Sequence, residues 1–198
     1  MHYHTHNTPG FVLGSSPSGE ASRYVYVFTR DLGLVGAHAQ NTRSINSKLR
    51  YALDAPARAV VSLIRGKHMW RLANAVPDKG FYSLWRKSPE KQKLCVRTFS
   101  LLKKLLAGED SNVELFTVID DFLKFLENYD LPSADEVKNT EAIIVLRILY
   151  LLGYVPENKP LKQFFETKEW NSEIIQAMSP HRKEAIKVIN ESLKETGL

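Results

Sequence analysis

Few residues could carry out covalent chemistry, and they do not cluster in the sequence. Cys95 is the single cysteine among 198 residues and lies in an apolar run. We expect it to be a core residue rather than a nucleophile, because a reactive thiol needs a polar, electropositive site. The acidic pairs Glu109/Asp110 and Asp120/Asp121 are typical of solvated helix ends and faces. The chain has no Gly-rich phosphate loop, Gly-x-Ser-x-Gly elbow or His-Glu-x-x-His pair. We therefore expect no enzymatic activity and no cofactor.

Three histidines alternate near the N-terminus, at His2, His4 and His6. On an extended segment they could bind a transition metal, but a flexible tail over residues 1–8 is the alternative that we favour. A lone cysteine excludes an internal disulfide and a closed four-cysteine zinc site. The sequence thus predicts no metal, and a reducing, cytoplasmic setting is its simplest interpretation.

Cations and aromatic rings alternate in the N-terminal part of the chain. Residues 1–104 contain 17 Lys and Arg against 5 Asp and Glu, whereas residues 105–198 contain 10 against 17. Single-stranded nucleic acid requires cations for its phosphates and flat rings for its bases, so this pattern favours a polyanion partner. Alternatively, the charge only solubilises this half. The candidate nucleic-acid-binding residues are Arg23, Arg30, Arg43, Lys48, Arg50, Arg65, Lys67, Trp70 and Arg71.

These candidates leave two questions open. Trp70 could stack on a base or fill the core, and residues 41–50 could contact phosphates or form an ordinary solvated loop. Strand alternation places one set of side chains on one face, Tyr24, Tyr26, Phe28 and Arg30, and the other set on the opposite face, Arg23, Val25, Val27 and Thr29. One of these faces must fill the interior.

Short strands are predicted throughout the N-terminal part, followed by helices. The strands are expected at residues 11–13, 23–30, 34–40, 60–65 and 69–73, from their β-branched and aromatic content and their turn residues. Five short strands in about 70 residues favour a small closed barrel of the oligonucleotide-binding type (OB-fold), which often carries a helix or excursion between its third and fourth strands.

The helices are predicted from their capping residues. Helix starts are expected at Ser88-Pro89, at capping boxes beginning with Ser111 and Ser133, and at Ser179-Pro180, and helix ends near Gly108, Gly153 and Gly197. The apolar run 142–152 predicts a helix buried on all sides. The fold class is therefore α+β, with an N-terminal five-stranded OB-fold barrel at 9–77 followed by an all-α helical domain at 78–198.

Several short motifs occur in an order that resembles the RecO family of recombination mediators. They are Gly-Phe-Val-Leu at 10–13, Gly-Glu-Ala-Ser-Arg at 19–23, Phe-Thr-Arg-Asp-Leu-Gly at 28–33, Ser-Lys-Leu at 47–49, Arg-Gly at 65–66 and Leu-Gly-Tyr-Val-Pro at 152–156. The chain departs from the family pattern at Gln40, where Lys is usual, and at Asn41, where Gly is usual. Residues 157–179 also lack the four-cysteine zinc module of many members, so no structural zinc is expected.

The resemblance implies binding of single- and double-stranded DNA, annealing of complementary strands and help in loading RecA. It also implies RecR and the acidic C-terminal tail of the single-stranded DNA-binding protein as partners. Candidate partner-binding residues on the helical half are Lys103, Lys104, Arg147 and Lys162. Two other classes stay open, an RNA-binding OB-fold module and a protein–protein adaptor that binds no nucleic acid.

Overall fold

The computed structural model describes residues 4–42, 48–53, 57–78, 88–155 and 159–197. The chain forms two compact units: a barrel unit of residues 1–87 with 99–116, and a helical unit of residues 88–98 with 117–198. The sequence suggests a single boundary near residue 77. In the structure, residues 99–116 belong to the barrel unit because their side chains pack against its strands.

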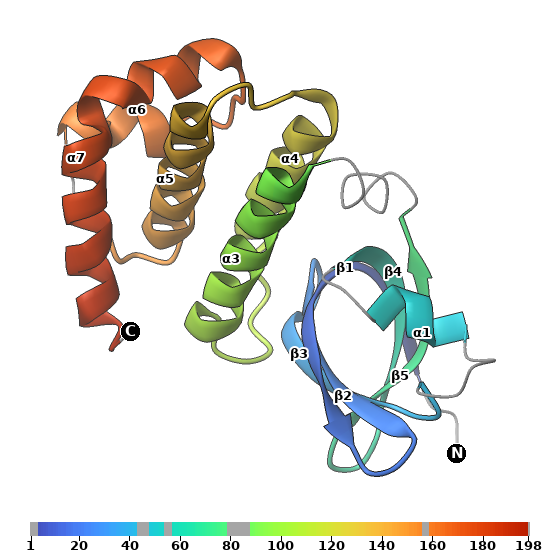
Figure 1. The fold of residues 1–198 in the computed structure, drawn as a ribbon. Helices are drawn as coiled ribbons and strands as arrows, with labels where there is room; N and C mark the ends of the chain where they lie inside the picture. Colours follow the sequence, from blue (N-terminus) through green and yellow to red (C-terminus); the bar gives the residue numbers. More distant parts are fainter. Residues whose placement is uncertain (1–3, 43–47, 54–56, 79–87, 156–158, 198) are drawn as a thin grey trace. The chain divides into compact units, whose positions relative to one another are not determined.

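The barrel unit contains the five-stranded OB-fold that the sequence predicts (Figure 1). The sheet closes in the order β1-β2-β3-β5-β4; only the β3–β5 pair is parallel. Its elements are β1 (Thr5–Ser18), β2 (Ser22–Thr29), β3 (Gly33–Ala39), α1 (Lys48–Leu53), β4 (Ala57–Arg65) and β5 (Trp70–Pro77). Helix α1 lies between β3 and β4, where the sequence allows for a helix.

Strand β1 is much longer than the predicted segment 11–13, and it begins inside the expected N-terminal tail. It pairs with β4 from Thr5 to Val12 and with β2 from Gly10 to Ser18. One strand must reach both neighbours to close the barrel. This pairing holds a Gly/Ser/Pro-rich stretch extended, which overrides its loop-like composition. Residues 5–8 are therefore part of the sheet.

The interior of the barrel is filled by the valine face of β2. Val25 and Val27 are fully buried and pack with Val35, Val61 and Leu63 in one apolar cluster. Since side chains alternate along a strand, Tyr24 and Tyr26 lie on the outer face of β2. The structure thereby settles which of the two alternating faces fills the barrel.

A second apolar core covers part of this outer face. Phe116 stacks on Phe11 with ring centroids 4.5 Å apart and lies 5.7 Å from Phe28, while Phe99 lies 5.9 Å from Phe11. Phe11, Phe28 and Phe99 are fully buried. Phe28 is thus shielded by residues 99–116, although it shares the outer face with Tyr24.

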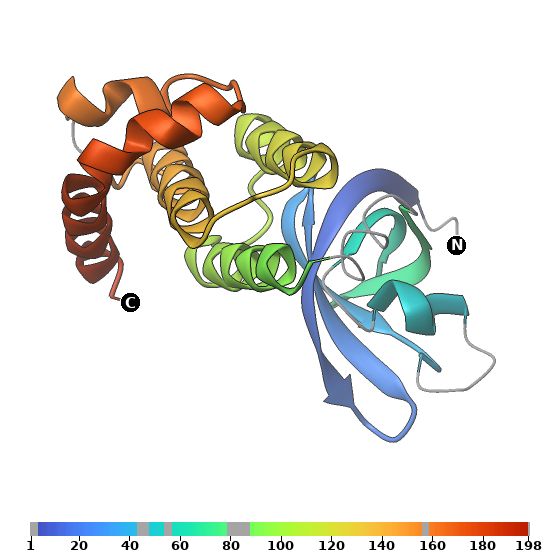
Figure 2. The ribbon, with the colours of Figure 1, turned by 45° about the horizontal axis from the view of Figure 1, so that its top comes forward.

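The remaining elements are helices, which Figure 2 shows from a second side. Ser133 Oγ accepts a hydrogen bond from Glu136 N at the start of α5, as predicted. The second helix begins one residue later than expected, because Asn112 Oδ1, rather than Ser111, accepts from Leu115 N. The helices are α3 (Pro89–Leu105), α4 (Val113–Asn128), α5 (Ala134–Leu151), η1 (Lys159–Leu161), α6 (Lys162–Phe165) and α7 (Ser172–Glu195).

The predicted start of the last helix at Ser179-Pro180 is wrong. Helix α7 begins at Ser172, capped by Asn171, and contains Pro180 in its interior. Figures 1 and 2 show α7 changing direction along its length, as an internal proline causes. The buried Asn139 donates to Ile175 O and Ser179 Oγ, both at 2.9 Å. These contacts support the backbone turn that precedes the proline.

Candidate nucleic-acid interface

Two tyrosines form a ring platform on the outer face of β2 and β3. The Tyr24 and Tyr26 rings meet edge to face with centroids 5.2 Å apart. Tyr24 stands opposite His38 and Tyr26 opposite Gly36. A Cβ atom added at Gly36 would lie 2.1 Å from Tyr24 Oη, so only glycine leaves room for this ring to lie across β3. We call Tyr24, Tyr26 and His38 the ring platform.

Cations flank the platform on both sides. Lys103 Nζ lies 4.1 Å from the centroid of the Tyr26 ring, in cation–π contact. On the other side, Arg71 of β5 is paired with His38 of β3 and donates a hydrogen bond to Gln40 Oε1 at 3.2 Å. The result is a row across β2, β3 and β5 in which the platform rings lie between Lys103 at one end and Arg71 at the other.

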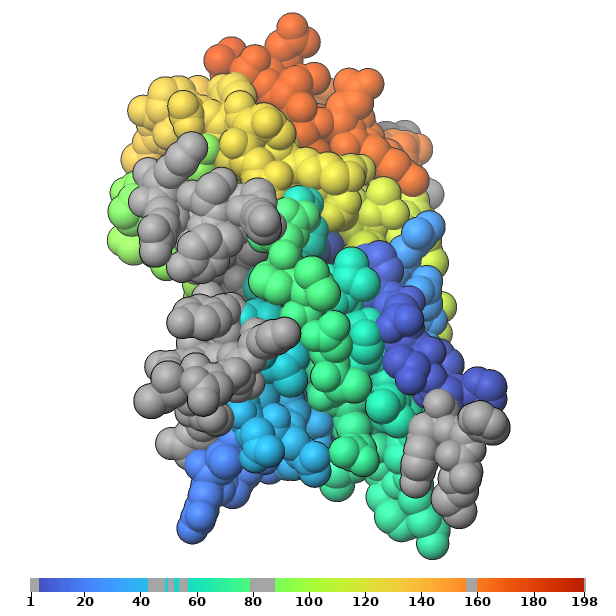
Figure 3. All heavy atoms as spheres, turned by 90° about the vertical axis from the view of Figure 1, so that its right-hand side faces the viewer, coloured from blue at the N-terminus to red at the C-terminus, as the bar shows by residue number. Residues whose placement is uncertain are grey.

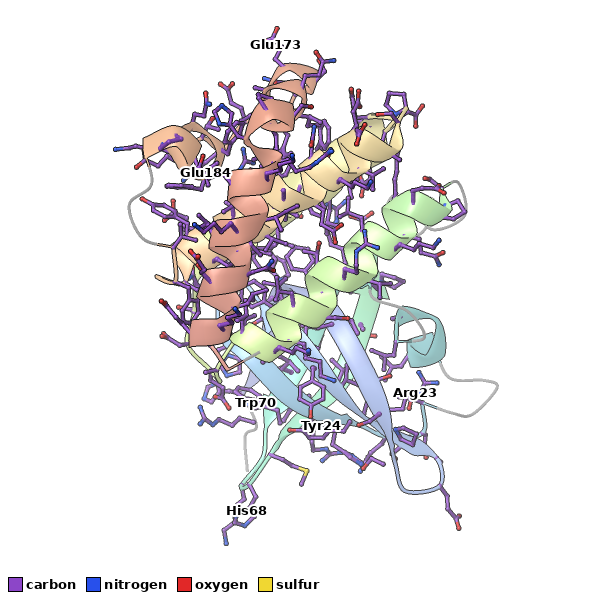
Figure 4. All side chains as sticks on the ribbon, turned by 60° about the vertical axis from the view of Figure 1, so that its left-hand side comes forward. Arg23, Tyr24, His68, Trp70, Glu173 and Glu184 are labelled. Atoms are coloured by element: carbon purple, nitrogen blue, oxygen red, sulfur yellow. The ribbon has the colours of Figure 1, made fainter. Side chains whose placement is uncertain are left out.

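Two turns project from one end of the barrel, as Figures 1 and 3 show. They are the β1–β2 turn at 19–21 and the β4–β5 turn at 66–69. Arg65, Lys67 and His68 are exposed at the second turn, and Figure 4 shows His68 at its tip. OB-folds bind oligonucleotides with the face of strands 2 and 3 and with these two turns.

Trp70 lies in the core, which decides between its two open interpretations. Its side chain is buried, and its indole Nε1 donates to Glu109 Oε1 at 2.7 Å. The other oxygen of Glu109 lies 3.7 Å from Arg65 Nη1, and the Arg65 guanidinium lies 5.3 Å from the indole centroid. Trp70 therefore does not present its ring face to a base and instead anchors the β4–β5 turn.

Of the other predicted DNA-contacting residues, the structure describes the side chains of Arg23 and Arg30. Arg23 Nη1 donates to Leu53 O at 3.1 Å and so fastens α1 to the barrel; Figure 4 shows it directed toward α1, away from Tyr24. Arg30 is exposed at the β2–β3 turn. Arg43 lies outside the described residues, as do the side chains of Lys48 and Arg50.

Three of the four predicted partner-binding residues lie at the surface. Lys104 is exposed, and Lys162 is exposed with its Nζ 3.4 Å from Glu166 Oε1. Lys103 belongs to the row described above. Arg147 does not lie at the surface: only 1% of it is exposed to solvent.

Arg147 instead holds the interior of the helical unit together. It donates to Phe164 O at 2.9 Å and to Glu169 O at 2.8 Å, and its guanidinium lies 4.2 Å from the centroid of the Trp170 ring. Burial lowers the pKa of Arg147 to about 10. This position follows from the run 142–152, which the sequence correctly predicts to be a buried helix; an arginine within it shares that burial.

Cys95 lies in the core, as the sequence predicts. Cys95 is fully buried, and burial raises the pKa of its thiol to about 12, so the thiolate is suppressed. Among the described residues, no three His, Cys, Asp or Glu side chains gather to hold a metal ion. Within the same part of the chain, no helix is long and apolar enough to cross a membrane.

Sequence reasoning missed His38, and it named Tyr24 and Tyr26 without selecting them. The signal that could have found the tyrosines is the alternation in β2, where two valines must face inward. His38 carries no such signal, since its place beside Tyr24 depends on the register of β2 against β3.

The chain is similar in sequence to a known family of proteins. Residues 1–81 match the family model "Recombination protein O N terminal". The chain is 27% identical over 154 residues to the DNA repair protein RecO of Dehalococcoides mccartyi, covering 78% of this chain and 58% of that protein. It is 24% identical over 155 residues to the protein of the same name from Gloeothece citriformis, covering 77% and 53%.

The similarity extends well past the barrel into the helices. The chain nevertheless spans only somewhat more than half the length of these two relatives. Residues 1–81 thus match the family's N-terminal model and fold as an OB-fold, and the chain is similar to several RecO proteins over about three quarters of its own length.

Proposed function

We propose that this protein acts in DNA repair and recombination by binding DNA and bringing complementary strands together, without a covalent step of its own. The observation that carries the proposal is the row of rings and cations across β2, β3 and β5. The name of its relatives, DNA repair protein RecO, supports the same role.

The geometry suggests how a strand is held. Bases would stack on the Tyr24 and Tyr26 rings, which any base can do because every base has a π-face. Lys103 and Arg71 would neutralise phosphates on either side, and Arg65 and Lys67 at the β4–β5 turn would extend the path. Two strands held this way, with their pairing edges exposed, meet at a raised local concentration and anneal faster.

Strand annealing tests the proposal directly. We expect the protein to accelerate annealing of complementary oligonucleotides, both free and coated with single-stranded DNA-binding protein. If about five phosphates are neutralised, the log of affinity should change with the log of salt concentration with a slope of roughly −3.5.

DNA and RNA oligomers of one sequence, compared side by side, separate the alternatives. Tenfold tighter binding of RNA would favour an RNA-binding module. No measurable binding to either polymer would favour a protein–protein adaptor.

The finer partner assignments rest on the family resemblance. We propose RecR and the acidic tail of the single-stranded DNA-binding protein as partners, with RecA loading as the outcome. Lys104 and Lys162 are the exposed candidates for the acidic tail. Each lysine is tested by itself: weaker binding of a tail peptide to Lys104→Ala or to Lys162→Ala than to the wild type would support that residue, and equal binding would exclude it.

Glu109 should weaken DNA binding through its contact with Arg65. Its carboxylate is 42% exposed and competes with phosphate for the Arg65 guanidinium, whose side chain is 69% exposed. Glu109→Gln keeps an oxygen to accept from Trp70 but removes the charge. We expect affinity for single strands to rise a few-fold at low salt, and the salt slope to steepen by about 0.7. Titrations at several salt concentrations measure both.

Glu195→Gln is the matched control, because it removes an equal charge from the exposed C-terminal end of α7. If the two variants change affinity equally, the effect comes from net charge alone and the contact between Glu109 and Arg65 contributes nothing.

A further inference from the structure

A pocket of about 190 Å³ lies beside the ring platform, where β3 and β5 meet. These two strands are joined at only two residue pairs, Ala37 with Trp70 and His38 with Arg71. Beyond His38 the strands are no longer paired, and the pocket lies next to the point where the pairing ends. The polar residues lining the pocket are His38, Gln40 and Arg71; its apolar residues include Leu49, Ile64 and Ala73.

The size and lining suit a single flat polar ring. Pockets for drug-sized ligands are about 300–1,000 Å³, so this one suits a smaller group. Leu49 of α1 and Ile64 of β4 supply apolar walls, and Gln40 offers an amide with both a donor and an acceptor. His38 adds one donor and one acceptor when neutral. Such a set can hydrogen-bond the edge of a nucleobase.

The backbone fixes Gln40 at the rim of this pocket. Asn41, the next residue, has φ of 54°, the left-handed conformation that glycine adopts freely and asparagine tolerates. This explains how Asn41 can stand where RecO proteins usually have glycine. Arg71 donates to the Gln40 amide from the opposite strand, which holds the two polar groups together.

We infer that this pocket receives one unstacked base from a DNA strand bound on the ring platform. The inference rests on the proposed function and deepens it. In a duplex the base edges are paired and stacked, so a base cannot enter without being extruded. The pocket would therefore favour single strands over duplexes.

Filling the pocket tests this inference. Ala73→Phe places a ring in the pocket without altering a charge or a platform ring. We expect single-strand affinity to fall about tenfold, the scale of one lost base contact, while duplex affinity stays unchanged. Val76→Phe is the matched control, since Val76 is an exposed residue of the same strand that does not line the pocket.

The outcomes separate the inference from the proposed function. If the wild type binds no DNA, the proposed function fails before any variant is compared, and the inference fails with it. If Ala73→Phe binds single strands like the wild type, or loses single strands and duplexes equally, the inference is wrong and the proposed function stands. Should Ala73→Phe not fold, as thermal unfolding would show, Ala73→Leu and Gln40→Leu take its place. The same ratio of single-strand to duplex affinity then decides whether the inference holds.

Discussion

Replacing both platform tyrosines, Tyr24→Ala with Tyr26→Ala, is expected to lower affinity for single-stranded DNA by about a hundredfold. Each ring offers a stacking surface worth about 1–3 kcal/mol per base. The salt slope should stay the same, because no cation is removed. Fluorescence titration of a labelled oligonucleotide at several salt concentrations measures both quantities.

Tyr24→Phe with Tyr26→Phe is the matched control, since it keeps both rings and removes only the hydroxyls. It should bind within a few-fold of the wild type. An alanine double variant that is folded but still binds like the wild type would show that bases do not stack on this face. A flattened slope would instead show that Lys103, which lies on the Tyr26 ring, had been displaced.

Arg147→Ala is expected to destabilise the helical unit by about 3–5 kcal/mol. The substitution leaves the carbonyls of Phe164 and Glu169 without their donor and removes the group stacked on Trp170. It also opens a cavity in the interior of the helical unit, where the Arg147 side chain lies. Urea unfolding followed by circular dichroism and by tryptophan fluorescence measures the loss.

Lys162→Ala removes a cation from the same unit and should cost less than about 1 kcal/mol, because Lys162 pairs with Glu166 at the surface. Arg147→Lys should fall between the two, since an ammonium lacks the planar fork that reaches both carbonyls. An Arg147→Ala protein as stable as Lys162→Ala would show that the buried contacts contribute no net stability.

The barrel was predictable because its signals are local. β-branched runs separated by Gly turns specify the strands, and their number and spacing favour the OB-fold. The long β1 was not predictable in the same way: its ends read as a polar tail and a flexible loop, and only pairing with both β2 and β4 keeps them extended. Pro180 led to the wrong helix start because the residue that caps the helix, Asn171, lies eight residues before Ser179 and is not followed by proline.

The candidate site was predictable in kind but not in detail. The sequence shows that this half is rich in cations and rings. In the structure, Arg71 is exposed on β5, and Arg65 and Lys67 are exposed at the β4–β5 turn. Trp70 and Arg23 were selected for their residue types, yet one fills the core and the other fastens α1. These roles depend on Glu109 and Leu53, which are distant in sequence, so local patterns do not reveal them.

The contribution of residues 99–116 to the barrel unit limits where this chain can be cut. A fragment ending at residue 87 would retain every strand but would lose Phe99 and Phe116, and so uncover the phenyl rings of Phe11 and Phe28. Such a fragment would expose an apolar surface and would be prone to self-association. Biochemists who wish to study the DNA-binding module by itself would have to supply the missing segment, or mask those rings with polar substitutions.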